Sequence, residues 1–218
     1  MANYNNAYSF PSIKEVIASE FPEAQILSSG FTGSVYCLND KTVIKSLSWD
    51  DFDNGLLVCW ETNKDGFIPA EILAMKWANT INNLVVQYVD HFHIEDVGYI
   101  IAMERLFPCL PTAFSREEIS AAITIAELEL EQLWASGWAH GDLRRPSMVR
   151  KGDMPIDVLY NNIMLTKGDN NQCVIRLVDT GFSALEQYDE DECIDTWIAK
   201  DKEDWRLFKE WILNYTRD

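Results

Sequence analysis

Basic residues are scarce in this chain. It carries 18 lysine and arginine residues against 35 aspartate and glutamate residues, which gives a formal net charge of −17. A negative field of this size repels a phosphate polyanion, so nucleic acid is excluded as the main partner. A basic surface on a partner protein would be attracted instead.

Long apolar runs and paired cysteines are also missing. No window approaches 18 uninterrupted apolar residues, and the first residues lack the charged and apolar regions of a secretory signal. We therefore expect no membrane span and a soluble, intracellular, cytosolic protein. The five cysteines are odd in number, widely spaced and without a CxxC pair. This usage predicts a reduced compartment and no structural zinc.

Repeats and linkers rich in glycine, serine or proline are absent, so composition does not divide the chain. Its 218 residues, 47% of them hydrophobic, are enough for one ordinary domain or two small lobes. Residues 26–38, a turn signal at 39–40 and residues 42–45 predict a β-hairpin followed by a strand. Residues 84–89 and 98–103 predict two further strands, and the near-continuous apolar run of the second indicates burial on both faces.

Helical patterns interrupt and follow these strands. Residues 70–78, directly after Pro69, predict a helix. A capping box that begins at Ser115 opens the longest predicted helix, which should end near Gly137. Two short strands and a last helix complete the pattern, at residues 162–165, 174–178 and 202–215. The order predicts an α+β fold with a cleft between a β-rich first part and a helical second part.

Glycine and lysine residues in the first part form a pattern typical of phosphate binding. Gly30 and Gly33 let a strand turn pass close to phosphates, with its backbone N–H groups exposed to them. Lys45 lies between apolar residues on the next strand, from which its ammonium can point towards α- and β-phosphates. Its natural partner is Glu71, in the first turn of a predicted helix, and Glu61 is a rival.

A second group of polar residues follows the longest predicted helix. His140-Gly141-Asp142 comes directly after that helix, and Asn162 begins a short strand further on. The triplet Asp179-Thr180-Gly181 follows the apolar strand at 174–178. Phosphoryl transfer needs few reactive side chains, because catalysis is mostly positioning and neutralisation of phosphate charge. These few residues can therefore define an activity.

The order of these motifs resembles that of the protein kinase family, from about residue 25 to about residue 210. The resemblance implies a two-lobe fold, with an N-terminal extension at 1–24, a β-rich N-lobe at 25–104 and a reduced, mainly helical C-lobe at 105–218. It also implies ATP and Mg²⁺ as cofactors and a protein as the substrate.

The resemblance also assigns roles to individual positions. Asp142 would accept or orient the proton of the attacking hydroxyl, and Lys45 and Glu71 would be the other catalytic residues. Asn162 and Asp179 would be the metal ligands. The nucleotide would be held by the glycine-rich loop, the strand lysine and the hinge, at Gly30, Thr32, Gly33, Val35, Lys45, Met103 and Glu104.

Departures from the family pattern bear on function. Gly141 replaces the usual arginine, which argues against control through a phosphorylated activation segment, and Thr180 stands where the family has phenylalanine. After Asp179 there is no APE-like sequence, so much of the usual platform for protein substrates is missing or supplied by a partner. Small kinase effectors that bacteria inject into host cells look like this, as do some fungal and viral kinase-like proteins. For an effector the location would be the host cytosol.

We therefore expect an ATP- and Mg²⁺-dependent phosphotransferase, in the first place a minimal Ser/Thr-type protein kinase. A small-molecule phosphotransferase or an atypical ATPase is an alternative, because such enzymes share the HGD loop. A second alternative is a pseudokinase that binds a protein through its acidic C-terminal region. His140 is expected to brace the loop around Asp142 rather than act as a base.

The distance in sequence between Asp142 and Asn162 is the largest departure. In the family the asparagine comes at the fifth position after the aspartate, which here is Ser147. Either residues 144–158 are an insertion, or Asp157 is the catalytic residue at the family spacing from Asn162, or Ser147 replaces the asparagine. We favour Asp142, because it follows a long helix as the family's catalytic loop does.

Overall fold

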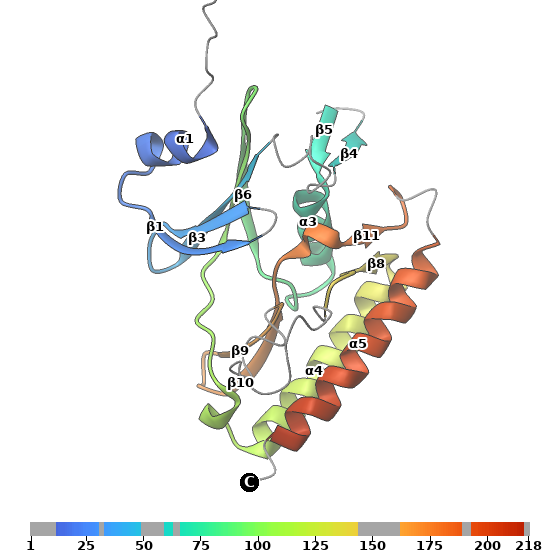
Figure 1. The fold of residues 1–218 in the computed structure, drawn as a ribbon. Helices are drawn as coiled ribbons and strands as arrows, with labels where there is room; N and C mark the ends of the chain where they lie inside the picture. The colour runs from blue at the N-terminus through green and yellow to red at the C-terminus, as the bar shows by residue number, and fades with distance from the viewer. Residues whose placement is uncertain are drawn as a thin grey trace, which may run out of the picture. The chain divides into compact units, whose positions relative to one another are not determined.

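The structure, a computed structural model, describes residues 12–30, 33–48, 59–62, 66–143, 162–188 and 193–215. The fold of these residues is α+β, as predicted, with a five-stranded antiparallel sheet and four α-helices (Figure 1). The chain forms two compact units. The first combines Met1–Leu57 with Val89–Arg105, and the second combines Val58–Tyr88 with Leu106–Asp218.

The five-stranded sheet forms most of the first unit. Its strands are β1 (Gln25–Gly30), β2 (Gly33–Cys37), β3 (Thr42–Ser48), β6 (Tyr88–Ile94) and β7 (Gly98–Glu104). They lie in the order β1-β2-β3-β7-β6. The predicted hairpin and following strand are confirmed: β1 pairs with β2, and β2 pairs with β3 across the turn at 39–41.

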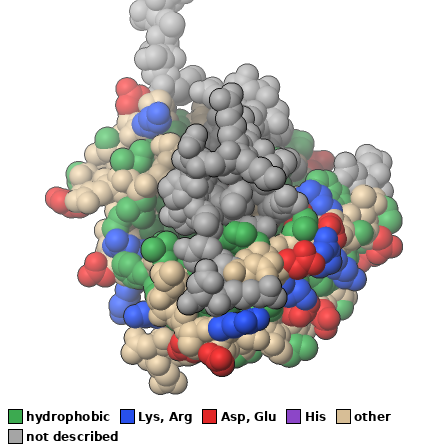
Figure 2. Space-filling model, turned by 60° about the horizontal axis from the view of Figure 1, so that its bottom comes forward, with side chains coloured by type: hydrophobic (Ala, Val, Ile, Leu, Met, Phe, Trp, Pro, Cys, Tyr) green, Lys and Arg blue, Asp and Glu red, His purple; other side chains and the backbone are tan. Residues whose placement is uncertain are grey.

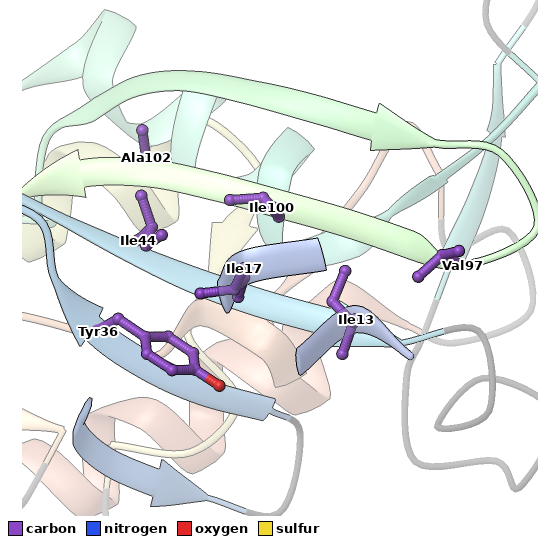
Figure 3. Packing of buried hydrophobic residues seen from close by; sticks show 7 residues of the cluster. All are labelled: Ile13, Ile17, Tyr36, Ile44, Val97, Ile100 and Ala102. Atoms are coloured by element: carbon purple, nitrogen blue, oxygen red, sulfur yellow. The ribbon is translucent and has the colours of Figure 1, made fainter. Parts of the chain in front are cut away.

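Helix α1 (Ile13–Glu20) packs on this sheet, although the sequence patterns did not predict it. Ser12 begins the helix in a capping box with Glu15, which satisfies two otherwise unpaired backbone N–H groups. Ile13 and Ile17, one turn apart, are buried against residues of the sheet and of the turn between β6 and β7. Figure 3 shows them: Tyr36, Ile44, Ile100 and Ala102 lie in the sheet, and Val97 lies in the turn. Burial of one such isoleucine stabilises the fold by about 1.5–3 kcal/mol.

The second unit holds the longer helices and the short strands. Its helices are α3 (Ala70–Ile81), α4 (Arg116–Ala135) and α5 (Ile194–Tyr215), with short 3-10 turns η1 (Pro111–Ala113) and η3 (Thr180–Phe182). Its strands form three two-stranded pairs: β4 (Cys59–Thr62) with β5 (Gly66–Pro69), β8 (Trp138–Ala139) with β11 (Ala184–Leu185), and β9 (Ile163–Lys167) with β10 (Cys173–Leu177).

Helices α4 and α5 run side by side along the second unit (Figure 1). The predicted capping box at Ser115 is present and begins α4. The apolar residues on the inner face of α4 are all buried, at Ile119, Ile123, Ala126, Leu130 and Leu133. Helix α5 begins at Ile194, earlier than the predicted residue 202, and buries Trp205 and Phe208.

The strand predicted at residues 84–89 is confirmed only at residues 88–89. Strand β6 covers Tyr88–Ile94 instead, and Leu84 to Val86 are buried in the second unit without forming a regular strand. The backbone N–H of Val86 donates to the carbonyl of Leu177 at 2.8 Å, and the N–H of Leu177 donates to the carbonyl of Leu84 at 2.8 Å. The apolar run therefore reflects burial, which periodicity alone does not distinguish from strand formation.

None of the described helices combines the length and the apolar content that crossing a bilayer requires.

We predict that Gly98→Ala destabilises the first unit much more than Gly66→Ala destabilises its own hairpin. Gly98 has φ +145°, and a Cβ atom there would lie 2.1 Å from the carbonyl oxygen of Leu47. Gly66 has φ +68° with no atom within 4 Å of such a Cβ, so its substitution costs only the left-handed backbone penalty of about 1–2 kcal/mol. Denaturant unfolding should show a larger loss for Gly98→Ala, and equal losses would contradict the packing at β3 and β7.

Candidate active site

The loop that carries Asp142 is braced by the buried ring of His140. The backbone N–H of Asp142 donates to Nδ1 of this ring at 3.3 Å, so Nδ1 is unprotonated. Nε2 lies 2.9 Å from the carbonyl oxygen of Val178 and must therefore carry the proton that it donates. One imidazole thus joins the loop to the residue before Asp179, as expected for a brace.

Burial lowers the pKa of His140 to about 4, although the hydrogen bond to Val178 and the charge of Asp179 act in the opposite direction. The ring is therefore neutral at physiological pH. Its only lone pair faces the N–H of Asp142, so the ring has no free basic atom with which to take a proton from a substrate.

Asp201 on α5 fixes the same loop from the other side, and the sequence analysis missed it. Its carboxylate accepts the backbone N–H of His140 at 2.6 Å and that of Gly141 at 3.0 Å, and the indole N–H of Trp134 lies 3.4 Å from it. Lys200, the preceding residue, donates to the carbonyl of Gly141. Burial raises the pKa of Asp201 to about 6, against the effect of these hydrogen bonds.

A sequence signal for Asp201 did exist. The residue occupies the buried stripe of α5 that continues, at helical spacing, through Trp205, Phe208 and Ile212. A carboxylate on an apolar stripe is costly unless hydrogen-bonded, so it marks a position with a specific partner. Because Glu203 and Asp204 follow it closely in the sequence, Asp201 was interpreted as part of an acidic run.

Gly141 has a steric reason to be glycine. Its φ is +79°, and a Cβ atom would lie 2.1 Å from the carbonyl oxygen of Phe182 and 3.1 Å from the ring of Trp197. No larger side chain fits without displacing that backbone. The absence of the family's arginine is therefore built into the packing of this loop.

Asn162 lies against Asp142 despite their separation in sequence. Its side-chain N–H₂ donates to the backbone carbonyl of Asp142 at 2.8 Å and lies 3.2 Å from its carboxylate oxygen Oδ2. This contact supports the alternative in which residues 144–158 are an insertion. The rival residues Asp157 and Ser147 lie outside the described residues.

Asp179 comes directly after β10 and has a left-handed backbone conformation, with φ 59° and ψ 65°. The preceding residue, Val178, donates its N–H to the carbonyl of Asn162 at 3.0 Å. The buried hydroxyl of Thr180 donates to the backbone carbonyl of Glu71 at 3.2 Å. The segment 178–180 is thus tied to both Asn162 and α3.

These bonds form a closed circuit in the second unit. His140 holds Val178, Val178 holds Asn162, and Asn162 holds Asp142. The circuit brings Asp142 into contact with Asn162 and ties Asn162 to Val178, the residue directly before Asp179. Glu71 belongs to the same unit and is buried in the first turn of α3.

The remaining predicted residues belong to the first unit. Lys45 is buried on β3, where it pairs with Val35 of β2 and Ile101 of β7. Because Ile44 faces α1, strand alternation places Lys45 on the other face of the sheet. Met103 and Glu104, predicted to form the hinge, end β7 opposite Val43 and Thr42.

The glycine-rich segment is partly described. Gly30 and Gly33 pair with each other at the end of the β1–β2 hairpin, and Thr32 lies outside the described residues. Gly33 has φ +134°, and a Cβ atom there would lie 1.9 Å from the carbonyl oxygen of Ser46. Glycine is therefore required at this position for the close approach of β2 to β3.

The donor atoms in the second unit fit a hard cation such as Mg²⁺. With its amide nitrogen engaged by Asp142, Asn162 could contact a cation through its amide oxygen, and Asp179 is a carboxylate, the other ligand type that Mg²⁺ accepts. Among the described residues there is no cluster of three or more His, Cys, Asp or Glu side chains that could hold a metal. Mg²⁺ does not require one, because it takes one or two protein ligands together with phosphate oxygens and water.

Comparison with models of known protein families gives no match, and no curated protein matches significantly. The case for an activity therefore rests on the residues themselves.

We predict that His140 keeps its neutral, Nε2-protonated form well below the usual pKa of histidine. Nitrogen chemical shifts of the ring, assigned with a His140→Gln variant, should show that tautomer and a titration midpoint near pH 4. A midpoint near the ordinary value of 6.5 would show that the ring is solvated and does not brace the loop.

We also predict a pH signature for Asp201. Because its pKa is raised from 3.8 to about 6, its contribution to stability is full below pH 3.8 and is lost as the pH rises to about 6. The Asp201→Asn variant has no carboxyl group at this position, so it does not lose stability in this way. Its unfolding free energy, relative to wild type, should therefore rise between pH 4 and pH 6 by up to roughly 1.4 kcal/mol per pH unit.

Denaturant unfolding of both proteins across this range provides the test. His140 gives the wild type an opposite slope between pH 4 and pH 6.5, but that slope is common to both proteins and cancels in the difference. A difference that is constant with pH would show that Asp201 does not titrate in this range.

Proposed function

We propose that this chain is an ATP- and Mg²⁺-dependent phosphotransferase, and in the first place a minimal Ser/Thr-type protein kinase. The observation that carries the proposal is the circuit of hydrogen bonds through His140, Val178, Asn162 and Asp142. It joins the carboxylate of Asp142 to the amide of Asn162, whose backbone carbonyl accepts the N–H of Val178, the residue before Asp179. The circuit thus links residues far apart in sequence that phosphoryl transfer would use for positioning and for metal binding.

In this proposal Asp142 orients the attacking hydroxyl and accepts its proton. The contact from Asn162 limits the rotation of the Asp142 carboxylate, which favours one productive position of the hydroxyl. Asn162 and Asp179 would hold Mg²⁺, which would neutralise the charge of the nucleotide phosphates. Lys45 supplies a positive charge for the phosphates, and Glu71 is the proposed partner of that lysine.

The second candidate is a small-molecule phosphotransferase or an ATPase of the HGD type. The packing around Gly141 favours it, because that position has no room for the arginine on which regulated protein kinases depend. Both candidates use the same catalytic residues and differ only in the acceptor of the phosphate.

We predict that Asp142→Ala and Asp179→Ala each lower the rate of phosphate transfer from labelled ATP by about 10²–10⁴-fold, since each removes a group that acts on the reacting atoms. Asp169→Ala, in the exposed turn between β9 and β10, is the matched control and should keep the wild-type rate. Generic protein substrates, a panel of small hydroxyl compounds and ATP alone serve as acceptors and distinguish the two candidates.

Asp157→Ala belongs in the same experiment. If it abolishes transfer while Asp142→Ala retains it, the assignment of the catalytic aspartate is wrong. If the wild type neither transfers phosphate nor hydrolyses ATP with any acceptor, the chain is a binding module of the pseudokinase kind and the proposal fails.

A further inference from the structure

On the face shown in Figure 2, charge alone does not mark a place where a partner would bind. Acidic, basic and hydrophobic side chains are mixed on the face of the molecule shown in Figure 2, although the net charge of the chain is −17. A docking surface must therefore be located by exposed apolar side chains that the fold itself does not use.

Helix α4 carries such side chains on its outer side. Ile125 and Leu128 are 59% and 58% exposed, while the opposite side of the helix is buried in the second unit. A helix that packs on one side only is expected to be polar on the other. Ile125 and Leu128 are three residues apart and therefore neighbours on the helix surface, with Ala121 one turn before Ile125. The three residues form an apolar stripe that the described fold does not cover.

A shallow hollow adjoins this stripe. It has a volume of about 450 Å³ and is lined by residues of the first half of α4: Arg116, Glu117, Ser120, Ala121 and Thr124. Ala121 belongs to both the hollow and the stripe. The small side chains of Ser120, Ala121 and Thr124 leave room for a larger side chain from a partner beside Ile125 and Leu128.

The charges on α4 define the chemistry of that partner. The helix has five glutamates, at positions 117, 118, 127, 129 and 131, and a single arginine. Glu118 caps the helix and Glu127 pairs with Lys209, so both are used within the fold. Glu117 and Glu131 are exposed and bracket the apolar stripe along the helix. A partner with basic residues around an apolar centre would complement this pattern.

We propose that the outer face of α4, made of Glu117, Ala121, Thr124, Ile125, Leu128 and Glu131, docks a basic amphipathic helix of a partner protein. Two apolar side chains of that helix would cover Ile125 and Leu128, and lysine or arginine residues would meet the two glutamates. A second copy of this chain is a poorer occupant, because it would bring the same glutamates against one another. The face contains none of the proposed catalytic residues, so docking and phosphate transfer are separable.

The test measures the binding of a fluorescein-labelled Leu/Lys peptide with helical amphipathic patterning, by fluorescence anisotropy on the full chain. A peptide of the same composition in scrambled order is the control for simple charge attraction. Ile125→Ser/Leu128→Ser should weaken binding of the patterned peptide by about tenfold or more, because the apolar centre of an interface carries most of its affinity. Val89→Ser/Phe92→Ser changes a pair of similarly exposed apolar residues on β6 and should have no effect.

A second pair of variants tests the charges. Glu117→Gln/Glu131→Gln should weaken binding about threefold at low ionic strength and reduce its salt dependence, whereas Glu20→Gln/Glu23→Gln, with the same change in net charge on exposed residues near α1, should not. Asp142→Ala should bind the peptide like wild type even where it abolishes phosphate transfer.

Two results would overturn the proposal. One is equal binding of the patterned and scrambled peptides, or equal effects of the α4 variants and their controls, since that would show attraction by net charge alone. The other is a dimer in sedimentation that Ile125→Ser/Leu128→Ser dissociates, since that would make a second copy the occupant of the face.

Discussion

The second unit depends on one interaction above the others, the contact of a buried carboxylate on α5 with the backbone of the loop before Asp142. Asp201 accepts two consecutive backbone N–H groups, from His140 and Gly141, and thereby sets the path of the loop. A buried carboxylate that loses such donors costs several kcal/mol, so the helix and the loop stabilise each other. The position of Asp142 is in this sense a consequence of how α5 packs on α4.

The charge states of the loop follow from the same burial. A neutral His140 and a carboxylate with a raised pKa lie on either side of one backbone segment, and their effects on stability oppose each other as the pH changes. Neither group is available to substrate, because each is engaged in hydrogen bonds within the unit. The proposed chemistry therefore falls to Asp142 in the loop, to Asn162 directly before β9 and to Asp179, two residues after β10. A rigid support of this kind is what catalysis by positioning needs.

Local signals predicted the parts of the fold that local chemistry controls. The capping box at Ser115 fixed the start of α4, and the turn at 39–41 fixed the pairing of β2 with β3, because both signals act within a few residues. The apolar run at 84–86 gave a wrong strand prediction. Its backbone forms hydrogen bonds with Leu177, which is far away in the sequence. For the same reason Asp201 was missed: its partners are about sixty residues away in sequence. The sequence did not settle whether Asn162 contacts Asp142, because a separation of 20 residues in sequence does not determine their distance in space.

The central claim is that Asn162 and Asp179 hold the metal of a bound metal–nucleotide complex, and paramagnetic Mn²⁺ bound with ATP tests it most directly. Amide resonances of residues 162–163 and 178–180 should broaden on addition of Mn²⁺ and ATP, while those of the turn at 168–172, at the far end of β9 and β10, should keep their line widths. Loss of the broadening in Asp179→Ala would show that Asp179 is needed to hold the metal. No broadening, or equal broadening at the turn, would contradict it.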